Sequence, residues 1–266
     1  MPESPTPDSR FLDCTGPIAM AHRGFAAGGD ENSMAAFARA VELGYRYLET
    51  DVRVTGDGVA LAFHDARLDR VTDRRGRVDA QPWSVVQRAR IAGREPIPRL
   101  DEVLDTWPDV RVNVDVKSDR GIGPAVDAIR RTRSVDRVCV AAFSTTRIAA
   151  LRAALGPRLC TSLGPREALN LRWRPVRAGQ FAGRCAQVPA RIGPRRLIDA
   201  RYLAAAHRAG AVVHAWTVNS RTEMVRLVDL GVDGIITDRA DVLREVLGAS
   251  GLWSAAIVPA KGKGHE

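Results

Sequence analysis

The sequence predicts an α/β fold of the (β/α)8 barrel type, with a small insertion after the second strand. Short β-rich runs alternate with helical patterns along most of the chain, as in successive βαβ units around a parallel sheet. Eight such runs can be counted, which is the number of strands in a closed barrel of this type. The chain length of 266 residues also agrees with the ~250 residues typical of this fold.

Each predicted strand is a short apolar run, and each predicted helix lies between two such runs. Asn32 is the expected N-cap of the first helix, and Gly44 lies just past its end. The predicted strands are Ile18–His22, Tyr47–Val52, Arg111–Val116, Val138–Phe143, Leu159–Ser162, Ala186–Val188, Val212–Thr217 and Gly234–Thr237. The predicted helices are Ser33–Leu43, Leu100–Thr106, Pro124–Thr132, Thr146–Leu155, Arg166–Leu171, Asp199–Arg208, Arg221–Leu230 and Ala240–Leu247.

The segment between the second and third strands holds about fifty residues, too many for a simple βα connection. Val59–Phe63 is predicted to be an extra strand, and residues 65–98 are predicted to form an Arg-rich insertion. Long loops at the C-terminal face of a barrel usually carry function, so the insertion is a candidate for a functional role. The barrel domain is expected at 17–248, between a disordered N-terminal tail at 1–16 and a C-terminal tail at 249–266.

The chain carries a formal net charge of +9, which favours anionic partners such as phosphates or anionic lipid. Nucleic acid is not expected as a partner, because the arginines are scattered and no nucleic-acid-binding motif is present. The sequence contains no run of 18 apolar residues, and Met1–Pro17 lacks the pattern of a signal peptide. We therefore expect a cytoplasmic protein without a transmembrane segment, with peripheral membrane contact left open. The sequence does not indicate an oligomeric state.

The four cysteines stand at positions 14, 139, 160 and 185, and none form a CxxC pair. Three of them fall in apolar stretches that are predicted to be strands. Buried thiols in a reducing compartment explain this pattern best.

Two acidic residues lie near the C-terminal end of the second predicted strand. Side chains at positions i and i+2 of a strand point to the same face, so Glu49 and Asp51 converge. Barrel enzymes place their active sites at this end of the strands. Two converging carboxylates repel each other unless a cation or a shared proton relieves them. A cation site and a pair of ordinary edge acids are both compatible with this pattern alone.

The third strand alternates strictly between valine and polar residues. Asn113, Asp115 and Lys117 share one face, and the valines share the other. The polar face is expected to point into the barrel mouth, where Asp115 is either a third carboxylate for a metal or a structural partner of Lys117. Three carboxylates without a Cys or His ligand favour a hard cation, Mg²⁺ or Ca²⁺, over zinc.

Two histidines follow predicted strands and are expected to open onto the same face. His22 ends the first strand and precedes Arg23, and His64 follows the extra strand. Imidazole gives and takes protons near neutral pH, and Arg23 can hold a phosphate by two hydrogen bonds. The pair therefore suits cleavage of a phosphodiester. The remaining histidines are weaker candidates, namely His207 on a helix, His214 on the seventh strand, where it can face outward, and His265 in the C-terminal tail.

Between residues 17 and 247 the chain carries a series of short motifs in a defined order: His22-Arg23-Gly24, Glu31-Asn32-Ser33, Glu49-Thr50-Asp51, His64-Asp65 followed by Leu68-Asp69-Arg70, Ile97-Pro98, Asn113 through Lys117, Trp216-Thr217-Val218-Asn219, and Gly231 through Asp238. Their order and spacing resemble those of the glycerophosphodiester phosphodiesterase family. The resemblance implies a (β/α)8 barrel with an insertion after the second strand and a divalent cation, usually Mg²⁺ or Ca²⁺. It also implies hydrolysis of glycerophosphodiesters to glycerol 3-phosphate and an alcohol.

The resemblance further implies a role for each matching residue. Glu49, Asp51 and Asp115 match the acidic metal ligands, and His22 and His64 match the general acid–base pair. The remaining positions match residues that contact the substrate: Arg23 and Lys117 for the phosphate, Glu31 for an acidic residue near the metal, and Trp216 for an aromatic wall beside the glycerol.

The chain departs from the family pattern at Asp115, where glutamate is usual, and at Asp30, where proline is usual. The shorter side chain of Asp115 weakens metal binding or leaves room for a water molecule. Two alternative functions keep the same fold. In the first, the barrel acts on lysophospholipids or other phospholipids. In the second, it binds a phosphate ligand without catalysis.

Overall fold

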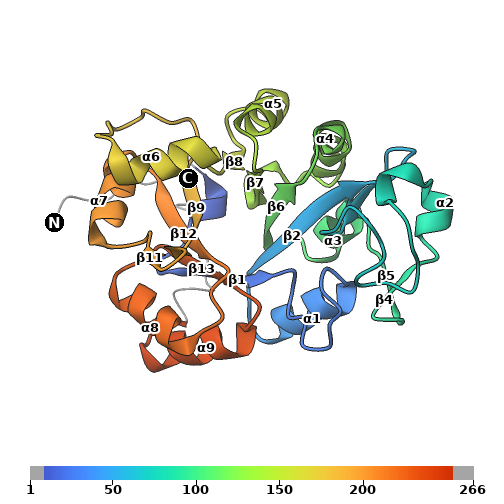
Figure 1. The fold of residues 1–266 in the computed structure, drawn as a ribbon, viewed down its shortest axis with the longest axis horizontal. Helices are drawn as coiled ribbons and strands as arrows, with labels where there is room; N and C mark the ends of the chain where they lie inside the picture. Colours follow the sequence, from blue (N-terminus) through green and yellow to red (C-terminus); the bar gives the residue numbers. More distant parts are fainter. Residues whose placement is uncertain (1–8, 254–266) are drawn as a thin grey trace, which may run out of the picture.

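A computed structural model of the chain describes residues 9–253. Within this range, eight parallel strands pair in the order β8-β7-β6-β2-β1-β13-β12-β9, which confirms the predicted barrel. Figure 1 shows helices packed around the outside of these strands. The barrel strands are β1 (Ile18–His22), β2 (Tyr47–Val54), β6 (Arg111–Val116), β7 (Val138–Ala141), β8 (Cys160–Thr161), β9 (Cys185–Pro189), β12 (Val212–Trp216) and β13 (Gly234–Thr237). The helices outside them are α1 (Met34–Glu42), α3 (Leu100–Thr106), α4 (Ile122–Arg131), α5 (Thr145–Leu155), α6 (Pro165–Trp173), α7 (Ala200–Arg208), α8 (Arg221–Asp229) and α9 (Ala240–Ala249).

The barrel closes between its shortest strand and the strand that follows it in the chain. A parallel bridge joins Ser162, just after β8, to Cys185 at the start of β9. The Leu163 amide donates to the Cys185 carbonyl at 2.7 Å, and the Arg184 amide donates to the Thr161 carbonyl at 2.8 Å. These bonds satisfy the backbone groups that an open edge would leave unpaired.

Alternation along the strands separates the packing surface from the interior of the barrel. In β6, Val112, Val114 and Val116 pack outward in one apolar cluster with residues of α3 and α4. The alternate residues, Asn113 and Asp115, point inward and line a cavity. The period of two in the sequence therefore decides which side chains meet helices and which meet each other inside the barrel.

The insertion between β2 and β6 has its own small core and secondary structure. Figure 1 shows it beside β2, at the edge of the molecule. The extra strand is confirmed as β3 (Ala60–Ala62), which pairs antiparallel with the end of β2. The rest contains a 3₁₀ turn η2 (Val78–Ala80), a short helix α2 (Trp83–Val86) and a hairpin of β4 (Arg90–Ile91) and β5 (Glu95–Pro96). Its buried apolar residues form a separate cluster of Leu61, Phe63, Leu68, Val78, Val86, Ala89, Ile91 and Ile97.

The described part of the N-terminal segment differs from the expected tail. Residues 10–12 form the 3₁₀ turn η1 (Arg10–Leu12), and Phe11 and Leu12 are buried. Phe11 packs edge-to-face on Tyr47 at 5.4 Å between ring centroids and accepts a hydrogen bond from its hydroxyl at 2.9 Å. The expectation of a disordered tail is therefore wrong for residues 9–16, and residues 1–8 lie outside the described range.

The C-terminal side also extends beyond the expected end of the domain. Helix α9 continues to Ala249, and Trp253 packs on Tyr45 with ring centroids 5.2 Å apart. The rest of the predicted C-terminal tail, from residue 254 on, lies outside the described residues.

The first helix begins one residue later than predicted. Ser33, rather than Asn32, is the N-cap of α1, and its hydroxyl accepts from the Ala36 amide at 3.1 Å. Gly44 follows the helix with φ of +97°, as its position past the helix end predicts.

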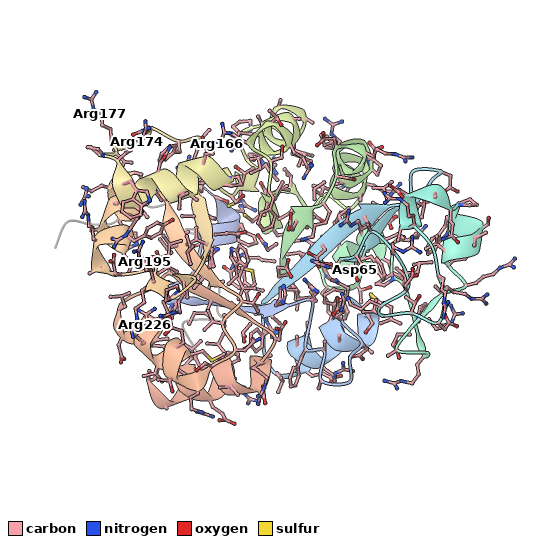
Figure 2. All side chains as sticks on the ribbon, viewed as in Figure 1. Asp65, Arg166, Arg174, Arg177, Arg195 and Arg226 are labelled. Atoms are coloured by element: carbon pink, nitrogen blue, oxygen red, sulfur yellow. The ribbon has the colours of Figure 1, made fainter. Side chains whose placement is uncertain are left out.

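Much of the positive charge lies on the outside of the barrel. Figure 2 shows Arg166, Arg174 and Arg177 projecting outward around α6. Other surface arginines pair with nearby acids, as Arg77 does with Asp79 and Arg239 with Asp241. In the described part of the chain, no helix is long and apolar enough to cross a membrane.

Candidate active site

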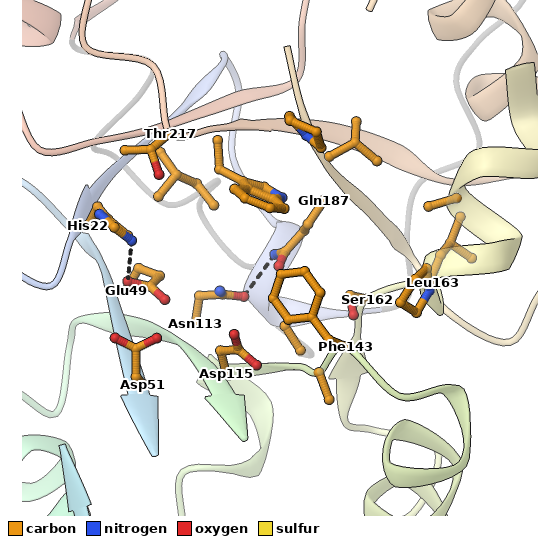
Figure 3. Close-up of a pocket in the computed structure, with 18 of the residues that line it drawn as sticks. His22, Glu49, Asp51, Asn113, Asp115, Phe143, Ser162, Leu163, Gln187 and Thr217 are labelled. Atoms are coloured by element: carbon orange, nitrogen blue, oxygen red, sulfur yellow. Dashed lines mark hydrogen bonds and ion pairs between the residues drawn. The ribbon is translucent and has the colours of Figure 1, made fainter. Parts of the chain in front are cut away.

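A cavity of about 410 Å³ opens at the C-terminal ends of the barrel strands. Figure 3 shows the acidic residues of β2 and β6 facing His22 across this cavity. Of the nine predicted site residues, Glu31 is the one that does not line the cavity. The other eight are His22, Arg23, Glu49, Asp51, His64, Asp115, Lys117 and Trp216.

A tight turn after β1 places His22 and Arg23 at the cavity. Arg23 has φ of +53° and Gly24 has φ of +81°, a region that L side chains rarely adopt. A Cβ atom at Gly24 would lie 2.7 Å from the backbone of Ala36, so the turn also needs glycine to fit against α1. The turn aims the Arg23 amide at the Glu49 carboxylate, to which it donates at 3.1 Å.

His22 lies between two carboxylates. Its Nδ1 is 2.5 Å from Asp238 Oδ1, and its Nε2 is 3.7 Å from Glu49 Oε2. Burial by itself lowers the pKa of His22, but Glu49 and Asp238 outweigh burial and hold the pKa above its usual value. The geometry therefore favours the protonated imidazolium.

His64 belongs to a chain of polar contacts that joins the insertion to the barrel. Its Nδ1 lies 2.6 Å from Asp65 Oδ1, and Arg70 binds the other oxygen of Asp65 at 2.6 Å. Hydrogen bonds from Arg70 lower the pKa of Asp65 to about 2. Arg70 also binds Glu31 through two nitrogens, at 2.6 and 3.0 Å, and Arg23 binds Glu31 at 2.8 Å. Glu31 thus acts on the cavity through Arg23 rather than by lining it.

Three buried carboxylates lie at the floor of the cavity with a single ammonium group between two of them. Lys117 Nζ is 2.7 Å from Asp51 Oδ1 and 2.5 Å from Asp115 Oδ2. Burial favours the neutral lysine, but Asp51 and Asp115 outweigh it and raise the pKa of Lys117. For Asp51, burial is outweighed by Lys117 and Arg23, so its pKa is lowered.

The pKa values of the other two carboxylates, Glu49 and Asp115, are raised. Burial, with the neighbouring Asp51, raises the pKa of Glu49 to about 7. Burial also raises the pKa of Asp115, and its Oδ1 is buried without a hydrogen-bond partner. An all-oxygen set of this kind fits a hard divalent cation. Among the described residues these carboxylate oxygens do not all lie within 4.8 Å of one another.

One wall and the rim of the cavity are apolar. Trp216, at the end of β12, packs edge-to-face on Phe143 with ring centroids 5.7 Å apart. Phe143 is 65% exposed, and Leu169 and Ile192 are 42% and 52% exposed at the same cavity. The site therefore has a charged floor and an apolar entrance.

Several site residues were not assigned a role from the sequence. Asp238 ends the motif after β13 and holds His22, and Asn219 Nδ2 donates to its second oxygen at 2.7 Å. Asn32, expected to cap a helix, instead donates to Asp51 Oδ2 at 3.1 Å and accepts from the Thr50 hydroxyl at 2.7 Å. The position of Asp238 directly after a barrel strand is the signal that marks it as a candidate.

A second missed contact forms part of the cavity floor. Gln187 Nε2, from β9, donates to Asn113 Oδ1 at 2.8 Å, as drawn in Figure 3. Gln187 follows Cys185 by two residues in a strand, so it shares the inward face, but a lone glutamine carries no other sequence signal.

Comparisons with known proteins show which family the chain resembles. Residues 22–242 match the model of the "Glycerophosphoryl diester phosphodiesterase family". The chain is 42% identical over 264 residues to a "Probable glycerophosphodiester phosphodiesterase 2" of Mycobacterium tuberculosis, which covers 96% of this chain and 100% of the relative. It is 28% identical over 243 residues to a glycerophosphodiester phosphodiesterase of Caldanaerobacter subterraneus, covering 85% of this chain and 96% of that one.

Solved structures show the same fold. A phosphodiesterase from Oleispira antarctica, in complex with the product sn-glycerol-3-phosphate, superimposes with a TM-score of 0.73. The two chains share 21% identity, over 87% of this chain and 97% of that one.

Proposed function

The chain belongs to the glycerophosphoryl diester phosphodiesterase family, and from that premise we propose that it hydrolyses glycerophosphodiesters to glycerol 3-phosphate and an alcohol. The observation that carries this proposal is the meeting of two histidines, three carboxylates and two cationic side chains at one cavity. A binding protein needs no pair of proton-transfer groups, so the geometry favours turnover over binding without catalysis. The glycerol 3-phosphate bound to the structural neighbour supports the same product here.

Glu49, Asp51 and Asp115 are the proposed ligands of a divalent cation, Mg²⁺ or Ca²⁺. The partnerless Asp115 Oδ1 and the raised pKa of Glu49 support this assignment. When bound, such an ion supplies Lewis-acid polarisation of the phosphoryl group.

Arg23 and Lys117 are the proposed phosphate-binding cations. Both lie at the cavity floor, and both are held by carboxylates that fix their direction. They neutralise negative charge as it develops on the phosphoryl oxygens in the transition state. Trp216 supports the glycerol from the cavity wall, and Glu31 holds Arg23 in position.

The two histidines divide the proton transfers. His22 is the proposed general acid, because Glu49 and Asp238 favour its protonated form and Asp238 fixes its ring. It donates a proton to the oxygen of the leaving alcohol. His64 is the proposed general base, since Asp65, held by Arg70, orients it at the cavity. It removes a proton from the attacking hydroxyl, which belongs to water or to the glycerol itself.

The test measures glycerol 3-phosphate released from glycerophosphocholine with Mg²⁺, with Ca²⁺ and with a chelator. We expect metal-dependent release in the wild type and a loss of ~10²–10⁴-fold in His22→Ala and His64→Ala. The two variants are then compared on a diester whose leaving group is nitrophenol, which departs without a proton. His22→Ala should regain most of its activity on that substrate, and His64→Ala should not.

Two outcomes contradict the proposal in different ways. Near-full activity of both histidine variants on glycerophosphocholine removes the acid–base assignment. Equal recovery of both variants on the nitrophenyl diester keeps the reaction and removes the division of roles.

A second candidate substrate class is lysophospholipids, favoured by the exposed apolar rim of Phe143, Leu169 and Ile192. An acyl chain leaving the cavity would bury these half-exposed side chains, and covering each is worth about half of the ~1.5–3 kcal/mol for a fully exposed one. The variants Leu169→Ser and Ile192→Ser should lower kcat/KM for lysophosphatidylcholine and leave glycerophosphocholine unchanged. Equal effects on both substrates count against this candidate.

A further inference from the structure

Three cysteines meet inside the barrel below the cavity. Cys139, Cys160 and Cys185 come from the consecutive strands β7, β8 and β9. All three are completely buried, and their sulfur atoms lie within 4.8 Å of one another. Among the residues that the structure describes, no other group of three His, Cys, Asp or Glu side chains meets that distance. They do not line the cavity, so the proposed mechanism leaves them without a role.

The separations between the sulfur atoms suit a shared metal ion. Cys160 Sγ and Cys185 Sγ are 3.6 Å apart, and Cys139 Sγ and Cys185 Sγ are 3.9 Å apart. Zinc binds thiolates at ~2.3 Å in tetrahedral sites, which places two sulfur ligands ~3.8 Å apart. The thiols therefore already stand at the separation that a common zinc ion requires, whereas a disulfide requires ~2.05 Å.

His214 is the candidate fourth ligand, but its nitrogen atoms do not lie within 4.8 Å of all three sulfur atoms, so its ring must move for it to bind the same ion. It is completely buried, and its Nε2 has no hydrogen-bond partner. In the register of β9 and β12, Val212 pairs with Cys185 and His214 pairs with Gln187, so His214 lies one step above the sulfur atoms. The sequence left an outward orientation of His214 open, and the structure places it inside.

We propose that Cys139, Cys160, Cys185 and His214 form a structural binding site for a thiophilic divalent ion, namely zinc. Binding releases three thiol protons to solvent, and the ion with three thiolates and one neutral imidazole carries one net negative charge. Four protein ligands leave no open position, which is the arrangement of structural rather than catalytic zinc.

The site lies directly under the floor of the cavity. Gln187 Nε2 is 4.0 Å from Cys139 Sγ and 2.8 Å from Asn113 Oδ1, which lines the cavity. Nδ1 of His214 is 3.4 Å from the same Gln187 nitrogen. An ion bound below therefore fixes the side chains that support the substrate cavity from beneath.

The ion must enter while the barrel folds. The cysteines share an apolar cluster with Phe11 and Leu12, the buried residues of the N-terminal segment. Loading is therefore tested by unfolding the full chain in denaturant with a chelator and refolding it with metal. Cobalt serves as the probe, because thiolate ligands give a near-ultraviolet sulfur-to-cobalt absorption band and the oxygen ligands at Glu49, Asp51 and Asp115 do not.

The refolded wild type is expected to hold one cobalt ion that shows the thiolate band and that zinc displaces. Cys139→Ala should lose most of the band, and the matched control Cys14→Ala should keep it. His214→Gln should keep the thiolate band and shift the visible absorption of cobalt. Circular dichroism establishes that each chain has refolded.

The proposal is overturned if the wild type regains its native circular dichroism spectrum but shows no thiolate band after free cobalt is removed. An equal loss of the band in Cys14→Ala and Cys139→Ala also overturns it. An unchanged visible spectrum in His214→Gln removes His214 as the fourth ligand. Because the band reports sulfur ligation alone, these outcomes are independent of whether the cavity above hydrolyses glycerophosphodiesters.

Discussion

The upper and lower halves of the barrel interior are built from the same strands but differ in chemistry. Strand β2 contributes the buried Tyr47 to the lower half and Glu49 and Asp51 to the upper half. The lower half holds mainly apolar side chains and the three cysteines and is closed by Phe11, whereas the upper half holds mutually paired charges at an open cavity. Successive inward-facing residues of one strand therefore belong first to the packed core and then to the candidate active site. Each half can be perturbed by its own substitutions.

The largest expected effect on stability comes from the lower half. Phe11→Ala removes a fully buried aromatic side chain and its contact with Tyr47. We expect the free energy of unfolding to fall by ~3–5 kcal/mol in urea denaturation. The KM for glycerophosphocholine should stay the same at a temperature where the variant is folded. A changed KM would show that the two halves are not separable.

In the upper half, the ammonium group of Lys117 stabilises two acids. Lys117→Met leaves Asp51 and Asp115 without their shared cation, so we expect a loss of about 3 kcal/mol in chelator. Added Mg²⁺ or Ca²⁺ should restore part of it, measured as thermal unfolding with and without metal. Arg147→Met, which breaks the ion pair with Asp119 outside the cavity, is the control and should show no such rescue.

Two His–Asp pairs, one at the cavity and one outside the barrel interior, sharpen the comparison further. Asp238→Asn removes the carboxylate that holds His22, so kcat should fall by ~10–100-fold with little change in KM. Asp233 makes the matching contact with His207 at 2.8 Å, away from the cavity. Asp233→Asn should leave kcat unchanged. Similar kcat values for the two variants would speak against a positioning role for Asp238.

The smallest expected effect is a pH dependence of stability from His207. The hydrogen bond to Asp233 raises the pKa of His207, so its contribution is complete below the unfolded pKa of ~6.5. It is lost as the pH rises through the higher folded pKa. Because the side chain is 40% exposed, we expect only a few tenths of a kcal/mol between roughly pH 6 and 8. His207→Ala should abolish this part of the slope in urea denaturation at several pH values.

The strands could be predicted because their pattern is local. Arg111–Val116 alternates strictly between inward and outward residues, and its predicted bounds agree with β6. Pairing between distant segments could not be predicted in this way. Asn32 and Ser33 are both good helix caps by residue type. Only the fold decides that Asn32 donates a hydrogen bond to Asp51 and leaves the cap to Ser33. Phe11 lies in a Pro- and Ser-rich stretch, so its burial depends on a barrel end that local sequence does not describe.

The candidate site shows the same division between local pattern and distant contact. Glu49, Asp51 and Asp115 follow from alternation within strands, and the structure brings all three to one cavity. The role of Glu31 depends on Arg70 from the insertion, a residue 39 positions away. Gln187 and His214 have ordinary residue types for a strand, and their meeting with the cysteines appears only when the barrel closes.

The turn at Gly24 sets a limit on how this enzyme can be altered by random mutagenesis. Its backbone has a positive φ, and an added Cβ would strike the backbone of α1 rather than a flexible side chain. A library at His22 or Arg23 should therefore contain folded but slow enzymes. In a library at Gly24, the folded variants should be those that keep glycine. The need to fold the turn therefore fixes this position, whatever is selected for in catalysis.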